Sequence, residues 1–398
     1  MASFSVGGAH SSLRTPSLFP TPPTIRMLKH HPVLNCTPFF TTPSLFSPKN
    51  LSLRSSKHTA GIACMSTTTS PVGKDDQKLI SGQPNEKVVQ VSSWIDYLPK
   101  EIQPFAKLAR VDKPIGTWFL IFPFAWSATL AAASGSIPDF RNLAVFACAA
   151  PFFRGAACTI NDFFDRDFDK KVERTKERPM ASGAVTPFQG LCFFAFQLLL
   201  SHGIFLQLTN YSWIIEAAFI FLSCTYPLMK RLTYWVQAYL GLTINWGAIL
   251  GWYAVKGSLQ PSIVLPLFLS GCFWTILYDT IYAHQDKEDD VKVGIKSTAL
   301  KFGESTKEWI TGFAIASIGT LALTAYNAAL GRPFYVFLAA ASGQLAWQIR
   351  TVNLSSAADC NRKYVNVFRF KVFGIGFVSN KWFGVLILSG ILLGRVFS

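Results

Sequence analysis

The sequence predicts an all-α protein that crosses a membrane many times. Half of its 398 residues are hydrophobic and 15% are charged, whereas soluble domains average about 25% charged residues. Long apolar stretches recur along the chain, and a membrane-spanning helix needs about 20 mostly apolar residues. The sequence lacks the short segments of alternating polar and apolar residues that are typical of a membrane β-barrel. We therefore expect a polytopic helical membrane protein.

Nine apolar stretches meet this length requirement, and charged or Pro- and Gly-containing segments separate them. Dispersed Gly residues inside the stretches are typical of close helix contacts in lipid. In chain order, we expect membrane helices at residues 115–134, 140–160, 188–207, 211–229, 235–255, 261–283, 309–329, 334–350 and 381–397.

The N-terminal part of the chain has a different composition. Residues 1–74 contain no Asp or Glu, carry seven Lys or Arg, and are rich in Ser, Thr and Pro. This composition is typical of an organelle transit peptide, and a disordered basic tail is the alternative. Residues 75–104 read as a linker with a short surface segment, so we place the membrane domain at 105–398.

Basic residues concentrate on one side of the membrane if the helices alternate in direction. The segment before the first helix and the loops after the even-numbered helices carry most of the Lys and Arg, as the positive-inside rule describes. The net charge of +15 therefore indicates contact with an anionic lipid bilayer. We expect no nucleic-acid partner.

An acidic segment closes the second predicted helix. Asn161, Asp165 and Asp169 are spaced i, i+4 and i+8, so on a helix they form one stripe of oxygen ligands, the first acidic stripe. Asp162 lies in the same segment. Basic residues follow directly, at Lys170, Lys171, Arg174 and Arg178.

Another acidic segment closes the sixth predicted helix. Asp279, Tyr282 and Asp286, followed by Asp289 or Asp290, fall at i, i+3, i+7 and i+10 or i+11, which defines the second acidic stripe. Both helices end on the same side of the membrane under the alternating topology. The two stripes can therefore belong to one site.

Closely packed carboxylates repel one another at neutral pH unless a cation lies between them. Oxygen ligands select a hard ion, and Mg²⁺ commonly binds one or two carboxylates together with water and phosphate oxygens. We expect the two stripes to hold a diphosphate through Mg²⁺; ordinary solvated loop charges are the alternative.

The eight Cys residues show no paired spacing that would indicate disulfides or zinc. His284 either contacts substrate or only ends a helix.

These segments resemble the signatures of the UbiA-superfamily intramembrane prenyltransferases. Asn161–Asp169, continued by Arg174–Gly183, resembles the first signature, and Tyr278–Ser297 resembles the second. Arg110–Thr117 is similar to the start of the 4-hydroxybenzoate polyprenyltransferase branch. The likeness covers roughly residues 100–360 and 378–398, and the insertion at 365–377 departs from the family pattern.

The resemblance implies a nine-helix bundle that needs Mg²⁺, a polyprenyl diphosphate donor and 4-hydroxybenzoate as acceptor. The ring carbon ortho to the hydroxyl group would be prenylated, in ubiquinone biosynthesis in the mitochondrial inner membrane. As metal ligands we predict Asn161, Asp162, Asp165, Asp169, Asp286, Asp289 and Asp290. As catalytic residues we predict Asp279, Tyr282 and Asp286. As substrate-binding residues we predict Arg110, Arg154, Lys170, Arg174, Arg178 and Lys296.

The acceptor carboxylate requires a cation. Arg154 lies seven residues before Asn161, on the same helix face, and an intramembrane Arg usually points inward. Arg110, at the mouth of the first helix, is the other candidate. Asp279, a nearby carboxylate or the released diphosphate would accept the ring proton.

The sequence leaves three alternatives open, concerning the class of protein, the prenyl donor and the location. A secondary transporter would also have many helices and intramembrane charges, although transporters usually place ionisable groups near the midplane. An enzyme of the same class could use geranyl diphosphate in specialised metabolism. The location could be a plastid or the endoplasmic reticulum.

Overall fold

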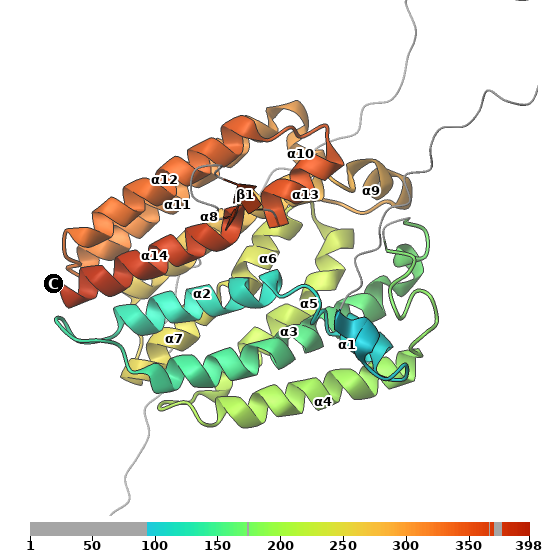
Figure 1. Cartoon of the computed structure of the whole chain (residues 1–398), viewed down its shortest axis with the longest axis horizontal. Helices are drawn as coiled ribbons and strands as arrows, with labels where there is room; N and C mark the ends of the chain where they lie inside the picture. Colours follow the sequence, from blue (N-terminus) through green and yellow to red (C-terminus); the bar gives the residue numbers. More distant parts are fainter. Residues whose placement is uncertain (1–93, 173–174, 366, 370–375) are drawn as a thin grey trace, which may run out of the picture. The chain divides into compact units, whose positions relative to one another are not determined.

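The computed structural model describes residues 94–172, 175–365, 367–369 and 376–398 (Figure 1). All of these residues belong to the structural unit Glu86–Ser398. The predicted transit peptide, most of the predicted linker and Arg174 lie outside the described residues.

Every predicted apolar stretch is helical in the structure. The corresponding helices are α2 (Ile115–Leu130), α3 (Phe140–Asp169), α4 (Pro187–Phe205), α5 (Trp213–Leu232), α6 (Val236–Ile244) with α7 (Gly247–Lys256), α8 (Pro261–Ala283), α11 (Thr306–Asn327), α12 (Pro333–Thr351) and α14 (Ser379–Val396).

The prediction of an all-α membrane fold is confirmed. Five helical stretches of the described residues are long and apolar enough to span a membrane: Phe140–Asp169, Pro187–Phe205, Trp213–Leu232, Pro261–Ala283 and Thr298–Asn327. The count of nine spans stays a prediction.

Shorter elements gather at one end of these helices. They are η1 (Trp94–Tyr97), α1 (Gln103–Leu108), α9 (Lys287–Val293), α10 (Thr298–Phe302), η2 (Gly303–Ser305) and α13 (Ala357–Val365). Figure 1 shows α1, α9, α10 and α13 at the same end of the bundle. Helices α3 and α8 run towards this end of the bundle, so their acidic C-terminal segments lie there as well.

Several helices begin where the sequence supplies a cap. The Asp139 side chain accepts a hydrogen bond from a backbone N–H at the start of α3. Thr186 and Gln189 form a reciprocal capping box on α4, and Ser212 caps α5. Such caps satisfy backbone donors that have no partner inside the helix.

The fifth predicted helix is broken into α6 and α7, which corrects the expectation of one helix at 235–255. Asn245, at the break, donates to the Gly241 carbonyl and to the Thr275 hydroxyl group on α8, both at 2.9 Å. The side chain fits because Gly271 of α8 has no Cβ to overlap it. A contact between distant segments thus interrupts the helix.

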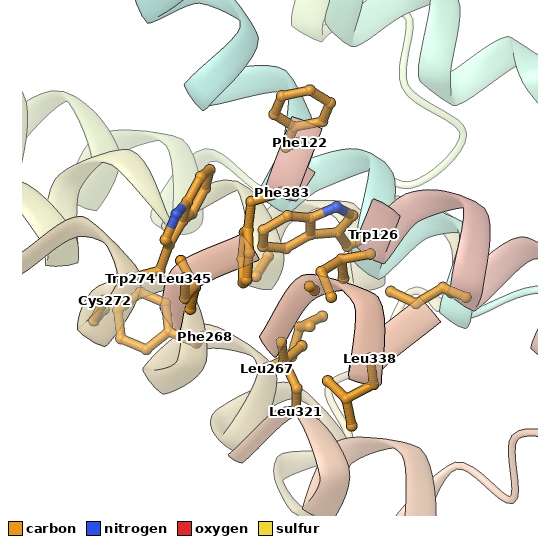
Figure 2. Close-up of a cluster of buried hydrophobic side chains, with 14 of the residues drawn as sticks. Phe122, Trp126, Leu267, Phe268, Cys272, Trp274, Leu321, Leu338, Leu345 and Phe383 are labelled. Atoms are coloured by element: carbon orange, nitrogen blue, oxygen red, sulfur yellow. The ribbon is translucent and has the colours of Figure 1, made fainter. Parts of the chain in front are cut away.

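Aromatic side chains hold the C-terminal helix against the rest of the bundle. Figure 2 shows Phe383 between Trp126 and Trp274, and the Phe383 and Trp274 rings stack with centroids 4.8 Å apart. The Trp126 indole donates to the Gly384 carbonyl at 3.0 Å. Helix α14 is therefore docked on α2, although the predicted insertion precedes it.

The insertion itself contains a short antiparallel pairing of β1 (Val367–Arg369) with β2 (Gly376–Val378). The partners are Val367↔Val378, Phe368↔Phe377 and Arg369↔Gly376. Residues 366 and 370–375 lie outside the described residues. Two three-residue strands are a minor addition to an otherwise helical fold.

Close packing of α2 against α14 can be tested with Gly384→Ala. A Cβ at this position would overlap the Phe122 ring, and overpacking typically costs about 1–3 kcal/mol. We expect a lower melting temperature in detergent. In the matched control, Gly319→Ala on α11, nothing lies within 4 Å of the new Cβ, so the melting temperature should stay the same or rise. Equal effects of both substitutions would contradict the packing.

Candidate active site

Both acidic stripes line one cavity of about 940 Å³. From α3 it is lined by Asn161, Asp165 and Asp169, and from α8 and its C-terminal loop by Asp279, Tyr282 and Asp286. The structure therefore places the two segments, more than 100 residues apart in the chain, around a common space. Asp162, Asp290, Arg110, Arg154, Arg178 and Lys296 also line this cavity.

The first acidic stripe lies on a continuous helix, because α3 extends to Asp169, nine residues beyond the predicted end. Asp165 and Asp169 are 4% and 7% exposed, so their charges need partners. Lys230, at the end of α5, supplies one: its Nζ lies 2.6 Å from Asp165 Oδ2 and 3.1 Å from Asn161 Oδ1.

Two arginines hold the other carboxylates of this segment. Arg178 Nη1 lies 2.9 Å and 3.1 Å from the Asp169 oxygens and 3.2 Å from Asp162 Oδ1. Arg110 Nη2 lies 2.9 Å and 3.2 Å from the two Asp162 oxygens. Burial lowers the pKa of the Arg110 guanidinium, but the charges of Asp162 and nearby groups more than offset this and raise it. Arg110 is therefore a permanent cation beside the acidic residues.

The second acidic stripe does not run along a single helix. Helix α8 ends at Ala283, and α9 begins a new helical direction at Lys287, with Asp286 at its N-cap position. Asp290 therefore lines the cavity, whereas Asp289 is absent from its lining and forms a surface ion pair with Lys292 at 2.9 Å. The assumption of one continuous helical stripe from Asp279 to Asp289 or Asp290 is thus wrong.

Other predicted substrate-binding residues are spread more widely. Lys170 is half-exposed outside the cavity lining and lies 3.4 Å from Asp167. Lys296 lines the cavity, and its Nζ lies 3.4 Å from the Leu232 carbonyl oxygen. Arg174 is not among the described residues.

Arg154 lines the cavity from the middle of α3. Its Nη1 lies 3.4 Å from the Arg110 carbonyl oxygen, and the missing side chain of Gly116 on α2 leaves room for its guanidinium. Within the described part of the chain, no carboxylate forms an ion pair with Arg154. Its charge is therefore available to an anionic ligand.

Sequence reasoning missed Lys230 as a candidate site residue. Its place at the end of an apolar helix, on the side of the membrane where both acidic stripes emerge, was a weak signal. Only the packing of α5 against α3 brings it to Asp165. Tyr226, one helical turn earlier, lines the same cavity.

His284 lies outside the cavity lining, 3.2 Å from the Thr306 hydroxyl group, and burial lowers its pKa to about 4. It therefore ends α8 as a neutral packing residue.

The oxygen-only donor set fits Mg²⁺. The cavity presents carboxylates and the Asn161 amide from two segments, and Mg²⁺ usually takes one or two carboxylates and completes its shell with water and phosphate oxygens. Among the described residues, no three His, Cys, Asp or Glu side chains converge as a ready-made metal cage. Asp165 and Asp286, one from each stripe, are among the cavity residues that could hold such an ion.

The apolar helical bundle thus surrounds a cavity whose acidic and basic side chains suit an anionic, metal-bound ligand. The model of the UbiA prenyltransferase family matches residues 120–374. The chain is 61% identical over 325 residues to the mitochondrial 4-hydroxybenzoate polyprenyltransferase of Arabidopsis thaliana, covering 81% of this chain and 76% of that one. It is 57% identical to 4-hydroxybenzoate geranyltransferase 2 of Lithospermum erythrorhizon, covering 77% of this chain and 95% of that one.

The fold agrees with these matches. An apo structure of a UbiA homolog from Aeropyrum pernix K1 superposes with a TM-score of 0.54 at 20% identity, over 70% of this chain and 96% of that one. The chain belongs to the UbiA prenyltransferase family. The family predicted from the two signatures is confirmed, and the protein is a prenyltransferase rather than a transporter.

Proposed function

We propose that the protein transfers a polyprenyl chain from polyprenyl diphosphate to 4-hydroxybenzoate and releases diphosphate, in ubiquinone biosynthesis. The observation that carries this proposal is that both acidic stripes line one cavity together with Lys230 and Arg178. The Arabidopsis relative is named for this activity and is 61% identical.

The donor diphosphate would lie between the two stripes. Mg²⁺ bound by Asp165 and Asp286 would neutralise phosphate charge and make diphosphate a better leaving group. Lys230 and Arg178 would stabilise the charge that develops on the leaving oxygen as the allylic C–O bond breaks. Apolar residues, including Phe119, Leu120, Phe153 and Leu240, line the rest of the cavity and exclude water from the allylic cation.

The acceptor would then attack the cation through the ring carbon ortho to its hydroxyl group. A new C–C bond forms, and the ring loses the proton from that carbon to restore aromaticity. Asp279 lines the cavity at the end of α8 and would accept this proton, with Tyr282 beside it on the next helical turn.

Arg154 would bind the carboxylate of 4-hydroxybenzoate, since its guanidinium has no ion pair among the described residues. A hydrogen bond to a charged group contributes about 1.5–3 kcal/mol, so Arg154→Gln should raise the KM for 4-hydroxybenzoate at least about tenfold. The KM for the donor should not change. Wild-type protein should prefer 4-hydroxybenzoate to 4-hydroxybenzamide, and the variant should not. An unchanged preference would assign the carboxylate to another cation.

We also propose that the protein acts in the mitochondrial inner membrane, with residues 1–74 as the transit peptide. The Arabidopsis and human relatives, at 61% and 46% identity, are both described as mitochondrial. Fusion of residues 1–74 to a fluorescent protein should direct it to mitochondria; plastid or endoplasmic reticulum fluorescence would contradict this location.

A geranyltransferase activity is the second candidate, because the Lithospermum enzyme named for it is 57% identical. Membranes containing the protein should be incubated with labelled 4-hydroxybenzoate, Mg²⁺ and prenyl diphosphates of increasing length, and the products weighed. The proposal predicts long-chain products, and a geranyl product alone would favour the second candidate. No prenylated product with any donor would overturn the proposed function.

A further inference from the structure

The turn between α1 and α2 places an arginine where the backbone favours glycine. The Arg110 N–H donates to the Lys107 carbonyl at 3.1 Å, and the Val111 N–H donates to the Ala106 carbonyl at 3.3 Å. These two bonds form a Schellman motif, in which the residue after the C-cap is usually Gly. Here that residue is Arg110, with φ of 56°. The turn itself does not explain why this position carries an Arg side chain, so the explanation lies in what that side chain contacts.

The partner of this side chain is Asp162. Arg110 Nη2 contacts both Asp162 oxygens, and Arg178 Nη1 lies 3.2 Å from one of them. The Asp162 side chain is only 1% exposed. One buried carboxylate thus joins two arginines from different segments of the chain, the α1–α2 turn and the segment after α3.

Both arginines also line the cavity. Within the described residues, Arg178 makes its hydrogen bonds through Nη1 alone, and the side chain of Arg110 makes its hydrogen bonds through Nη2 alone. Arg110 Nε is buried and has no hydrogen-bond partner there. Each guanidinium therefore keeps N–H groups that a phosphate oxygen could accept from, in the planar geometry that suits phosphate.

Asp162 differs from its neighbours in the first acidic stripe. Asn161, Asp165 and Asp169 share one face of α3. Asp162 follows Asn161 directly, so its side chain leaves the helix in a different direction. Its oxygens already accept three hydrogen bonds from two permanent cations, whereas Asp165 is held by Lys230. A metal ion at Asp162 would have to displace both guanidinium groups.

We propose that Asp162 is a positioning residue that orients Arg110 and Arg178 towards the donor diphosphate, and that it is not a metal ligand. This inference rests on the proposed function for its substrate, and it assigns Arg110 to the diphosphate rather than to the acceptor carboxylate. The charges on these arginines bind the diphosphate independently of the metal.

The first experiment compares Asp162→Asn with Asp167→Asn in the full-length protein. Asp167 lies on the exposed side of the same helix end, where it pairs with Arg166 and Lys170. Asp162→Asn should raise the KM for prenyl diphosphate about tenfold, the loss expected for misplaced charge-assisted hydrogen bonds. The Mg²⁺ concentration for half-maximal activity and the KM for the acceptor should stay unchanged. Asp167→Asn should behave as wild type.

The second experiment separates binding from folding with Arg110→Gly. Glycine suits the left-handed turn, and Asp162 keeps Arg178 as its partner, so the melting temperature of the apo-protein should not fall. Stabilisation by inorganic diphosphate in EDTA, measured as a thermal shift, should be present in wild type and lost in Arg110→Gly and Asp162→Asn. This readout needs neither metal nor turnover, so it tests the proposal even if 4-hydroxybenzoate is not the acceptor.

Three results would overturn the proposal. A higher Mg²⁺ requirement in Asp162→Asn would make Asp162 a metal ligand. A selective rise in the KM for the acceptor in Arg110→Gly would assign this arginine to the carboxylate. Full stabilisation of both variants by inorganic diphosphate in EDTA would show that the anion needs neither Arg110 nor the orientation that Asp162 imposes.

Discussion

Asp165→Asn is expected to lower kcat/KM by about 10²–10³-fold, the loss typical when one preorganised charge is removed from a transition state. Asp165 lines the cavity, is 4% exposed and is held 2.6 Å from Lys230. The amide keeps the shape of the side chain but removes the charge that would bind Mg²⁺. Prenylation of 4-hydroxybenzoate by membranes containing equal amounts of protein measures the effect.

The matched control for this substitution is Asp167→Asn, two residues further along the same helix. The Asp167 side chain is 67% exposed and does not line the cavity. Its replacement should leave turnover near the wild-type rate, since exposed ion pairs contribute little. Comparable losses in both variants would indicate general damage to the end of α3.

Asp286→Asn is expected to cause a loss of similar size, about 10²–10³-fold, whereas Asp289→Asn should have little effect. Asp286 lines the cavity between α8 and α9, while Asp289 forms a surface ion pair with Lys292. The sequence predicts both residues as metal ligands, whereas in the structure only Asp286 lines the cavity. This pair of variants therefore tests the structural assignment against the sequence prediction. Steady-state rates over a range of Mg²⁺ concentrations measure the difference.

The opposite order of effects, with Asp289 essential and Asp286 dispensable, would contradict the observed geometry. It would mean that α9 continues the direction of α8 when substrate is bound. Addition of excess Mg²⁺ should partly restore Asp286→Asn, because weakened metal binding is offset by mass action, and should leave Asp289→Asn unchanged.

The helices could be predicted from the sequence because apolar length is a local property. The first acidic stripe could be predicted for a similar reason: Asn161, Asp165 and Asp169 recur with the helical period, and α3 is regular through all three. The family likeness rests on the same local strings. Local pattern was therefore enough for the fold class and for one half of the cavity.

Contacts between distant segments explain what the sequence did not predict. The break at Asn245 depends on Thr275, thirty residues away, and the role of Lys230 depends on the packing of α5 against α3. The different positions of Asp289 and Asp290 follow from the end of α8 at Ala283, where no Pro or Gly marks a stop. The break at Asn245 and the end of α8 have no local signal, and that of Lys230 is weak.

The central claim, that the two acidic stripes jointly hold a metal-bound diphosphate, is tested most directly by Mn²⁺ binding. Electron paramagnetic resonance would follow Mn²⁺ titrated into the purified protein with the unreactive donor analogue geranyl thiodiphosphate. We predict that wild-type protein and Asp167→Asn bind Mn²⁺ tightly only when the analogue is present, and that Asp165→Asn and Asp286→Asn both lose this binding. Tight, analogue-dependent binding that persists in either of these two variants would contradict a site shared by both stripes.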